Sequence, residues 1–331
     1  MHIDNVIRGR LAPSPTGALH LGNARSFLLA WLSVRARGGT VVMRIEDLDH
    51  PKVKPWTVAE IFEDLRWLGL DWDEGPDVGG GYGPYVQRER GEQYAAALEV
   101  LKDQGLVYPC VCRRQDVEAA QAAPHAEDYQ RYPGTCRERF GSFAEASALL
   151  PSERIPAWRY RAADDTISFD DGFVGYREAN VAQRDGDFVL ARDVQGAGYM
   201  LAVVVDDAAM GITEVLRGDD LLPATHRQLL LYRALGIEPP QFFHVPLVVG
   251  PDGKRLAKRH GDTRLRFYRE QGVTPEQITG FLAWSCGLVP FGTLCRPDEL
   301  IADFALAKLP REPLVLTADL SRAISRVCAI A

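Results

Sequence analysis

A histidine and a glycine stand where the first strand pattern of the chain meets its first helix pattern. The segment APSPTGALHLGNARSFLLAW, residues 12–31, places His20, Gly22 and Asn23 at the start of that helix. A helix N-terminus has unpaired backbone N–H groups and partial positive charge, which suit a phosphate group. Glycine lets a nucleotide approach the backbone, and histidine adds a directed donor. So short a motif is more often an ordinary loop, so a second signal is needed.

A basic loop supplies that second signal. GKRLAKRHGD, residues 253–262, follows the last strand pattern and carries Lys254, Arg255 and Lys258. Such a loop can bind a polyphosphate whose negative charge grows in a transition state. Basic residues continue as far as Arg269 with one carboxylate, Asp262, among them. The simpler interpretation of this run is a solvated surface.

Three cysteines are spaced like metal ligands. Cys110 and Cys112 are two residues apart, which puts both thiols on one side of an extended backbone, and Cys136 follows in the segment YPGTC. Three sulfurs and one further ligand would form a tetrahedral structural zinc site. The alternative is free thiols in a reducing compartment.

Strand and helix patterns alternate on both sides of this cysteine region and predict a parallel α/β core. The expected strands are 6–12, 40–45, 199–205, 212–216 and 243–249. The expected helices are 24–32, 58–68, 92–102, 225–235, 275–284 and 297–307. We expect a doubly wound sheet whose two halves are 1–106 and 196–252, an insert at 107–195, and a basic loop with a small helical domain at 253–331.

The composition is that of an ordinary globular protein. The chain has 331 residues, of which 46% are apolar and 25% charged, and its net charge is −7. No apolar run approaches the roughly 18 residues that cross a bilayer, and the N-terminus lacks a secretory signal pattern. We therefore expect a cytoplasmic protein with no membrane partner. The acidic balance argues against wholesale coating of nucleic acid, although a local basic patch can still bind it.

Five segments in register resemble the glutamyl branch of the class I aminoacyl-tRNA synthetases. His20 and Gly22 resemble the HIGH motif, and the loop around Lys258 resembles the KMSKS motif, with Ala257 where serine is usual. The segments are RLAPSPTGALHLGNAR, RIEDLD, YMLAVVVDD, ITEVLRGDDLLPATHRQLLLYRALG and KRLAK. Too few residues follow Arg269 for an anticodon-reading domain, so the chain resembles the short glutamyl-Q tRNA(Asp) synthetases of that branch.

This resemblance implies a ligase with a Rossmann-type catalytic core. The enzyme would activate L-glutamate with ATP and Mg²⁺ to glutamyl adenylate without tRNA, and transfer glutamate to queuosine in the anticodon of tRNA(Asp). The implied catalytic residues are His20, Gly22, Asn23 and Lys258. ATP binding is implied for His20, Gly22, Arg255 and Lys258, and glutamate binding for Arg10, Ser14, Glu46, Tyr199 and Arg217.

The resemblance also implies one structural Zn²⁺ per chain. Its ligands would be Cys110, Cys112, Tyr132 and Cys136. His125 lies in the gap between the two halves of this motif and is chemically a better ligand than tyrosine. Tyr132 and His125 therefore both stay candidates for the fourth position.

Three other functions stay open. A truncated glutamyl-tRNA synthetase would charge the 3′ end of tRNA(Glu). A nucleotidyltransferase acting on a small molecule would also use an HxGH loop, but the glutamate-site residues and the insert disfavour it. A non-catalytic RNA-binding paralogue is disfavoured because His20, Gly22, Lys258 and both pocket arginines are retained.

Overall fold

Four parallel strands form the centre of the molecule in the computed structural model. β1 (Arg8–Leu11) pairs with β2 (Thr40–Met43), and β8 (Glu214–Gly218) pairs with β9 (Gln241–Val245). The Thr213 amide donates to the Arg8 carbonyl at 2.9 Å, which sets β1 beside β8. The structure describes residues 6–48, 53–54, 56–113, 115–117, 131–191, 196–256 and 261–326.

Helices cover both faces of these strands, as expected for an α/β core. Successive strand residues point to opposite faces, so Val41 and Met43 enter one hydrophobic core and Val42 enters another. The first core includes residues of α1 (Leu21–Arg35), α2 (Thr57–Trp67) and α10 (Pro275–Ser285). The second includes residues of α3 (Gly91–Asp103), α7 (Tyr199–Ala209) and α8 (Leu222–Leu235).

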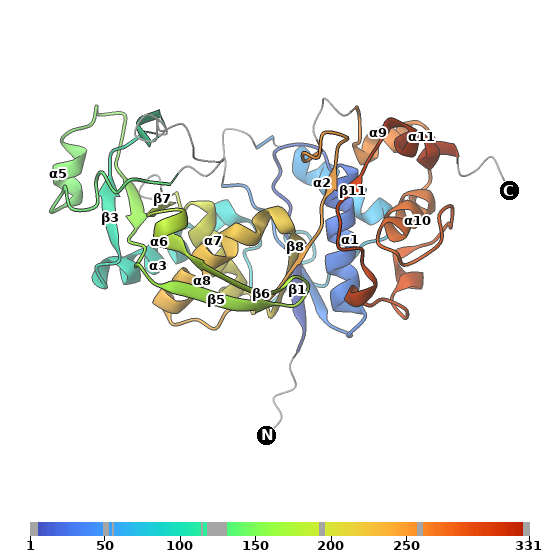
Figure 1. Ribbon diagram of the computed structural model, residues 1–331, viewed down its shortest axis with the longest axis horizontal. Helices are drawn as coiled ribbons and strands as arrows, with labels where there is room; N and C mark the ends of the chain where they lie inside the picture. The colour runs from blue at the N-terminus through green and yellow to red at the C-terminus, as the bar shows by residue number, and fades with distance from the viewer. Residues whose placement is uncertain are drawn as a thin grey trace, which may run out of the picture.

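Residues 107–191 contain only antiparallel pairing among the strands that the structure describes. One sheet has the order β3 (Val107–Cys110), β4 (Ala157–Tyr160) and β7 (Phe188–Ala191). A hairpin of β5 (Thr166–Asp171) and β6 (Gly175–Asn180) follows, with short helices α5 (Phe143–Ser147) and α6 (Val181–Arg184). In Figure 1 this region lies on the left, and the hairpin extends from it toward the labels of β8 and β1 at the centre.

The C-terminal part lies at the opposite end of the molecule (Figure 1). Its elements are α9 (Leu265–Glu270), α10, α11 (Ala318–Arg326) and β11 (Leu314–Val315), which pairs in parallel with β10 (Val248–Val249). The predicted helix 297–307 is wrong. Only the 3₁₀ turns Pro297–Leu300 and Leu306–Lys308 form there.

The predicted strand 199–205 is also wrong, because these residues form the helix α7. Residues 201–207 are all buried, and a helix that is apolar on every side cannot be told from a buried strand by its periodicity. Gly211, at φ +63°, lies just beyond the end of the helix. Across the described ranges, no helix has both the length and the apolar character needed to cross a membrane.

The remaining predicted elements are confirmed near their expected positions. The strand pattern 243–249 is divided between β9 and β10, with Pro246, which has no backbone N–H to donate, between them. The described residues also form the 3₁₀ turns Gln87–Glu89 and Asp219–Leu221.

Candidate active site

The loop after β1 brings His20 to the N-terminus of α1. His20 is the N-cap residue, and its Nδ1 accepts hydrogen bonds from the backbone amides of Gly22 at 3.1 Å and Asn23 at 3.3 Å. The Asn23 side chain accepts the His20 amide in return. Because Nδ1 is an acceptor here, a neutral His20 ring carries its proton on Nε2.

His20 is neutral at physiological pH. Burial, and then the positive charge of Arg255, lower the pKa of His20 from 6.5 to about 4. Between these two values the unfolded chain binds the proton and the folded protein does not. This residue therefore stabilises the fold above pH 6.5, and that contribution is lost as the pH falls toward 4.

Imidazole ¹⁵N NMR should show this tautomer directly. We expect His20 to carry its proton on Nε2 at pH 7 and to stay neutral on titration down to about pH 4. His20→Asn identifies its resonance. A doubly protonated His20 at pH 6, or a proton on Nδ1 at pH 7, would contradict the arrangement.

One cavity of about 580 Å³ brings the predicted residues together. It lies between the loop after β1, α7, and the segments that follow β8 and β9. Nine of the residues expected at the site line it: Arg10, Ser14, His20, Gly22, Asn23, Glu46, Tyr199, Arg217 and Arg255. Lys258 and Ala257 lie outside the described residues.

Arg217 is held on three sides within the wall of this cavity. It is only 5% exposed, and its Nε–H donates to His244 Nε2 at 3.0 Å. Its Nη2 group donates to Thr225 Oγ1 at 2.9 Å and to Gln228 Oε1 at 2.7 Å. The third nitrogen, Nη1, is buried and has no hydrogen-bond partner among the described residues. Burial lowers the pKa of Arg217, so a ligand carboxylate at Nη1 would be favoured.

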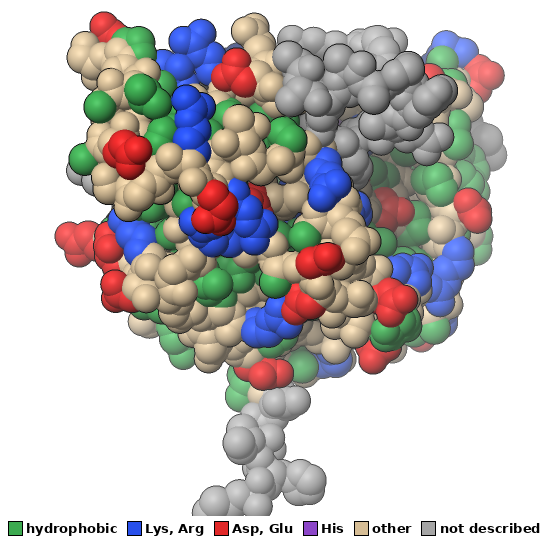
Figure 2. All heavy atoms as spheres, turned by 60° about the vertical axis from the view of Figure 1, so that its left-hand side comes forward, with side chains coloured by type: hydrophobic (Ala, Val, Ile, Leu, Met, Phe, Trp, Pro, Cys, Tyr) green, Lys and Arg blue, Asp and Glu red, His purple; other side chains and the backbone are tan. Residues whose placement is uncertain are grey.

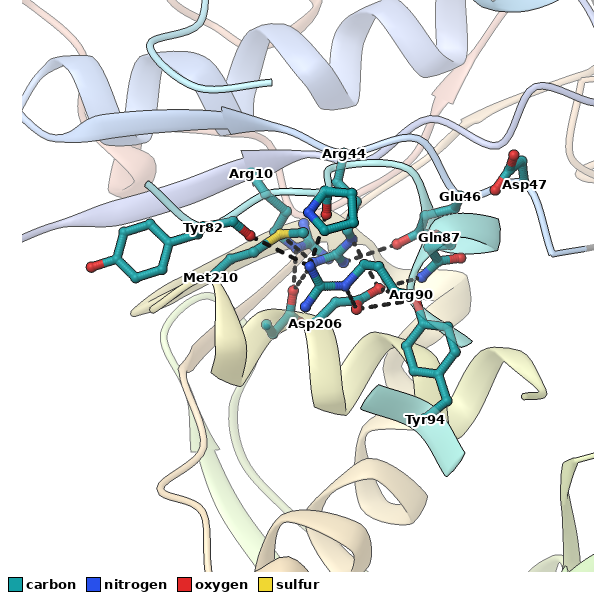
Figure 3. A network of polar contacts seen from close by, with 12 residues as sticks. Arg10, Arg44, Glu46, Asp47, Tyr82, Gln87, Arg90, Tyr94, Asp206 and Met210 are labelled. Atoms are coloured by element: carbon teal, nitrogen blue, oxygen red, sulfur yellow. Dashed lines mark hydrogen bonds and ion pairs between the residues drawn. The ribbon is translucent and has the colours of Figure 1, made fainter. Parts of the chain in front are cut away.

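A buried ionic network lies behind Arg10 and Glu46, two residues that line the cavity (Figure 3). Arg44 is fully buried and donates to Glu46 at 2.9 Å and to Asp207 at 2.6 Å. Asp207 lies 3.6 Å from Nε of Arg10. Burial raises the pKa of Glu46 against the opposing charge of Arg44. The network fixes Glu46 and Arg10 as a carboxylate and a cation on one cavity wall.

Asp206 ties the same network to α3 and the turn before it. Its carboxylate accepts from Arg90 at 2.6 Å, from Gln87 at 2.8 Å and from the Tyr94 hydroxyl at 2.9 Å. In Figure 3 these side chains converge on Asp206. So many donors on a completely buried carboxylate make it a rigid support for the cavity rather than a reacting group.

Much of the basic run is paired with carboxylates. Arg255 pairs with Asp220 at 2.6 Å, Arg266 with Glu270 at 2.9 Å, and Arg269 with Glu63 at 2.8 Å. Arg264 pairs with Asp262. The described part is thus not a continuous cationic surface. Figure 2 presents the side of the molecule that carries the insert, and there too acidic and basic side chains are interspersed.

The predicted metal ligands converge at the edge of β3. The sulfurs of Cys110, Cys112 and Cys136 lie within 4.8 Å of one another. Tyr132 Oη lies 3.5 Å from Cys110 Sγ and 3.6 Å from Cys112 Sγ, and it accepts the Cys136 amide at 2.8 Å. Arg159 Nε donates to Cys110 Sγ at 3.3 Å. His125 lies outside the described residues.

The sequence reasoning missed the residues that support the cavity. These are His244, Thr225 and Gln228 around Arg217, and Arg44, Asp206 and Asp207 behind Glu46. One signal was present, since two consecutive aspartates close an apolar run at 206–207. The prediction placed these two aspartates at the end of a strand, whereas in the structure both are buried residues of α7.

A family model, curated relatives and a solved structure that match this chain are all tRNA synthetases. The model of the family "tRNA synthetases class I (E and Q), catalytic domain" matches residues 6–310. The glutamyl-Q tRNA(Asp) synthetase of Nitratidesulfovibrio vulgaris is 48% identical over 95% of this chain and 97% of that protein. The glutamate–tRNA ligase 2 of Syntrophus aciditrophicus is 39% identical over 94% of this chain and 64% of that protein. A crystal structure of the glutamate–tRNA synthetase from Elizabethkingia anophelis matches with a TM-score of 0.82 at 30% identity, over 97% of this chain and 70% of that one.

Proposed function

Because this chain belongs to the family of class I tRNA synthetase catalytic domains for E and Q, we propose that it is a glutamate-activating ligase. It converts L-glutamate and MgATP to glutamyl adenylate and pyrophosphate without tRNA. It then transfers the glutamyl group to the queuosine base in the anticodon of tRNA(Asp). The acceptor is favoured over the 3′ end of tRNA(Glu) by the higher identity to the relative named glutamyl-Q tRNA(Asp) synthetase.

The observation that carries the proposal is Nη1 of Arg217, which has no partner among the described residues and lies in the wall of a cavity that also includes the N-terminus of α1. A buried guanidinium N–H without a partner needs an acceptor, and the side-chain carboxylate of glutamate supplies one that also balances the positive charge. Arg10 lines the same cavity as a second cation. Glu46 can accept the substrate ammonium, and the Tyr199 hydroxyl adds a donor.

The activation step needs no general base, because the α-carboxylate is already ionised. It attacks the α-phosphorus of ATP, a new P–O bond forms, and the bond to pyrophosphate breaks. His20 donates from Nε2 to a phosphate oxygen, while the N-terminus of α1 favours the negative charge. Arg255 and Lys258 would bind the departing pyrophosphate, whose charge grows in the transition state.

Pyrophosphate exchange tests this function in its simplest form. Purified protein should incorporate labelled pyrophosphate into ATP when glutamate is present and RNA is absent. Glutamine should not replace glutamate, because its neutral amide leaves a buried guanidinium without a charged partner. An exchange that strictly requires tRNA would favour a truncated glutamyl-tRNA synthetase instead.

We further propose that the cysteine cluster holds a structural zinc ion. A tetrahedral site with Zn–S bonds of about 2.3 Å and a Zn–O bond of about 2.0 Å has edges of about 3.5–3.8 Å. The 3.5 Å between the sulfurs of Cys112 and Cys136 and the distances to Tyr132 Oη fit such edges. Arg159 also lies over the Tyr132 ring, 3.6 Å from its centroid, so a cation adjoins the anionic ligands.

Metal analysis of protein never exposed to chelator should find about one zinc per chain. Cys136→Ser should release it, since one of three thiolates is lost. Tyr132→Phe keeps the ring but removes the oxygen, so zinc should be lost if tyrosine is the fourth ligand and kept if His125 is. His125→Ala should give the opposite result, so that zinc is kept if tyrosine is the fourth ligand and lost if His125 is. Protein without zinc would overturn this assignment.

A further inference from the structure

A chain of hydrogen bonds joins the β5–β6 hairpin to the arginine in the cavity. Asp171, the last residue of β5, lies 2.6 Å from Nδ1 of His244 through its Oδ2. His244 Nε2 accepts the Nε–H of Arg217 at 3.0 Å. All three side chains are at most 5% exposed. The hairpin therefore contacts the proposed substrate site through only one intermediate residue.

The hairpin turn is firmly seated on β9. The other oxygen of Asp171, Oδ1, accepts backbone amides of Phe173 and Val174 at 2.9 Å and of His244 at 3.2 Å. The Gly172 amide donates to the Phe242 carbonyl at 2.9 Å. A side chain at Gly172 would place its Cβ 2.0 Å from the Phe243 ring, so only glycine permits this approach. The position of Asp171 is thus fixed by the backbone.

This geometry determines which nitrogen of His244 carries the proton. A carboxylate can only accept, so His244 donates its Nδ1–H to Asp171. Its Nε2 then has a lone pair, which the Nε–H of Arg217 requires. Burial lowers the pKa of His244 despite the bond to Asp171, and nearby Arg217 and Arg10 act in the same direction. His244 is therefore a neutral acceptor aimed at the guanidinium.

We propose that Asp171 and His244 are positioning residues for substrate selection, which orient Arg217 so that only Nη1 is left for the ligand. The inference rests on the proposed function, since it assigns that ligand as the glutamate side-chain carboxylate. His244, Thr225 and Gln228 occupy the other N–H groups of Arg217. An amide such as glutamine offers one acceptor and one donor, and its donor would meet no acceptor on this guanidinium.

Asp171→Asn tests the chain of hydrogen bonds from Asp171 through His244 to Arg217, and it changes the shape of the side chain very little. Three backbone amides retain the amide oxygen at the Oδ1 position, so the amide NH₂ group faces His244 Nδ1. That group donates, which moves the imidazole proton to Nε2, toward the Nε–H of Arg217. In pyrophosphate exchange we expect KM for glutamate to rise roughly 10- to 100-fold, with KM for ATP unchanged. Asp170→Asn, at the exposed neighbouring position, is the control and should change neither value.

His244→Gln separates positioning from simple support of the hairpin. Glutamine can present its amide oxygen to Arg217 and has no tautomer for Asp171 to set. Asp171→Asn should therefore raise KM for glutamate less than about twofold in the His244→Gln background. If Asp171→Asn raises KM for glutamate equally in both backgrounds, Asp171 only supports the fold. If it raises KM in neither background, the proposed positioning role is overturned.

Imidazole ¹⁵N NMR gives a readout that is independent of activity. His244 should carry its proton on Nδ1 in the unmodified protein and on Nε2 in Asp171→Asn. A proton on Nε2 in the unmodified protein would overturn the inference even if glutamate is activated normally. Absence of glutamate-dependent exchange in the unmodified protein would instead overturn the proposed function, and the inference with it.

Discussion

Replacing Arg217 with alanine should lower kcat/KM for glutamate in pyrophosphate exchange by about 10³-fold. The substitution removes the cation whose Nη1 has no partner among the described residues, and it leaves the glutamate carboxylate buried without its countercharge. Removing one member of a buried charged pair costs about 3–5 kcal/mol, and each factor of ten corresponds to about 1.4 kcal/mol. KM for ATP should change little, because His20 and the α1 N-terminus are untouched.

Two variants separate this loss from misfolding. Arg233→Ala removes an exposed arginine of α8, the helix that carries Thr225 and Gln228, and this arginine pairs with Asp165 on the surface, so the kinetics should not change. Arg217→Lys keeps the charge but cannot satisfy His244, Thr225 and Gln228 together, so it should restore only part of the activity. Circular dichroism and the melting temperature check that each variant is folded. A normal KM for glutamate in folded Arg217→Ala would remove Arg217 from the substrate site.

The sequence predicted the parts of the site that lie within short motifs. Nine implied residues line one cavity, because each lies near the C-terminal end of a strand, follows a strand or lies in the first turn of a helix at the same end of the parallel sheet. Gly22 and His20 are an example, since the N-terminus of α1 determines where both lie. Their assigned roles stay predictions.

Long-range partners could not be predicted from the sequence. Arg217 is held by His244 from β9, and His244 is held by Asp171 from the distant β5–β6 hairpin, so their contact depends on how the insert docks. The two aspartates 206–207 were predicted at the end of a strand and lie in a helix instead. Residues 201–207 of their segment, α7, are all buried, so the hydrophobic pattern does not distinguish a helix from a strand.

The presence or absence of queuosine in the acceptor tRNA should change glutamate labelling more than any substitution in the protein changes activity. An unmodified guanine at the wobble position has no hydroxyl on its base to receive a glutamyl group, whereas queuosine does. Bases in an exposed loop are also those that proteins read with sequence specificity. We therefore expect glutamate to label tRNA from cells with the queuosine pathway and to leave tRNA from cells without it at background.

The most direct test follows labelled glutamate into purified tRNA(Asp) with and without queuosine, and into tRNA(Glu), with ATP and the full chain. The label should enter only tRNA(Asp) that contains queuosine, and nuclease digestion should recover it on the anticodon nucleotide. Equal labelling of tRNA(Asp) with and without queuosine, labelling of tRNA(Glu), or label on the 3′ terminal adenosine would contradict the proposed function.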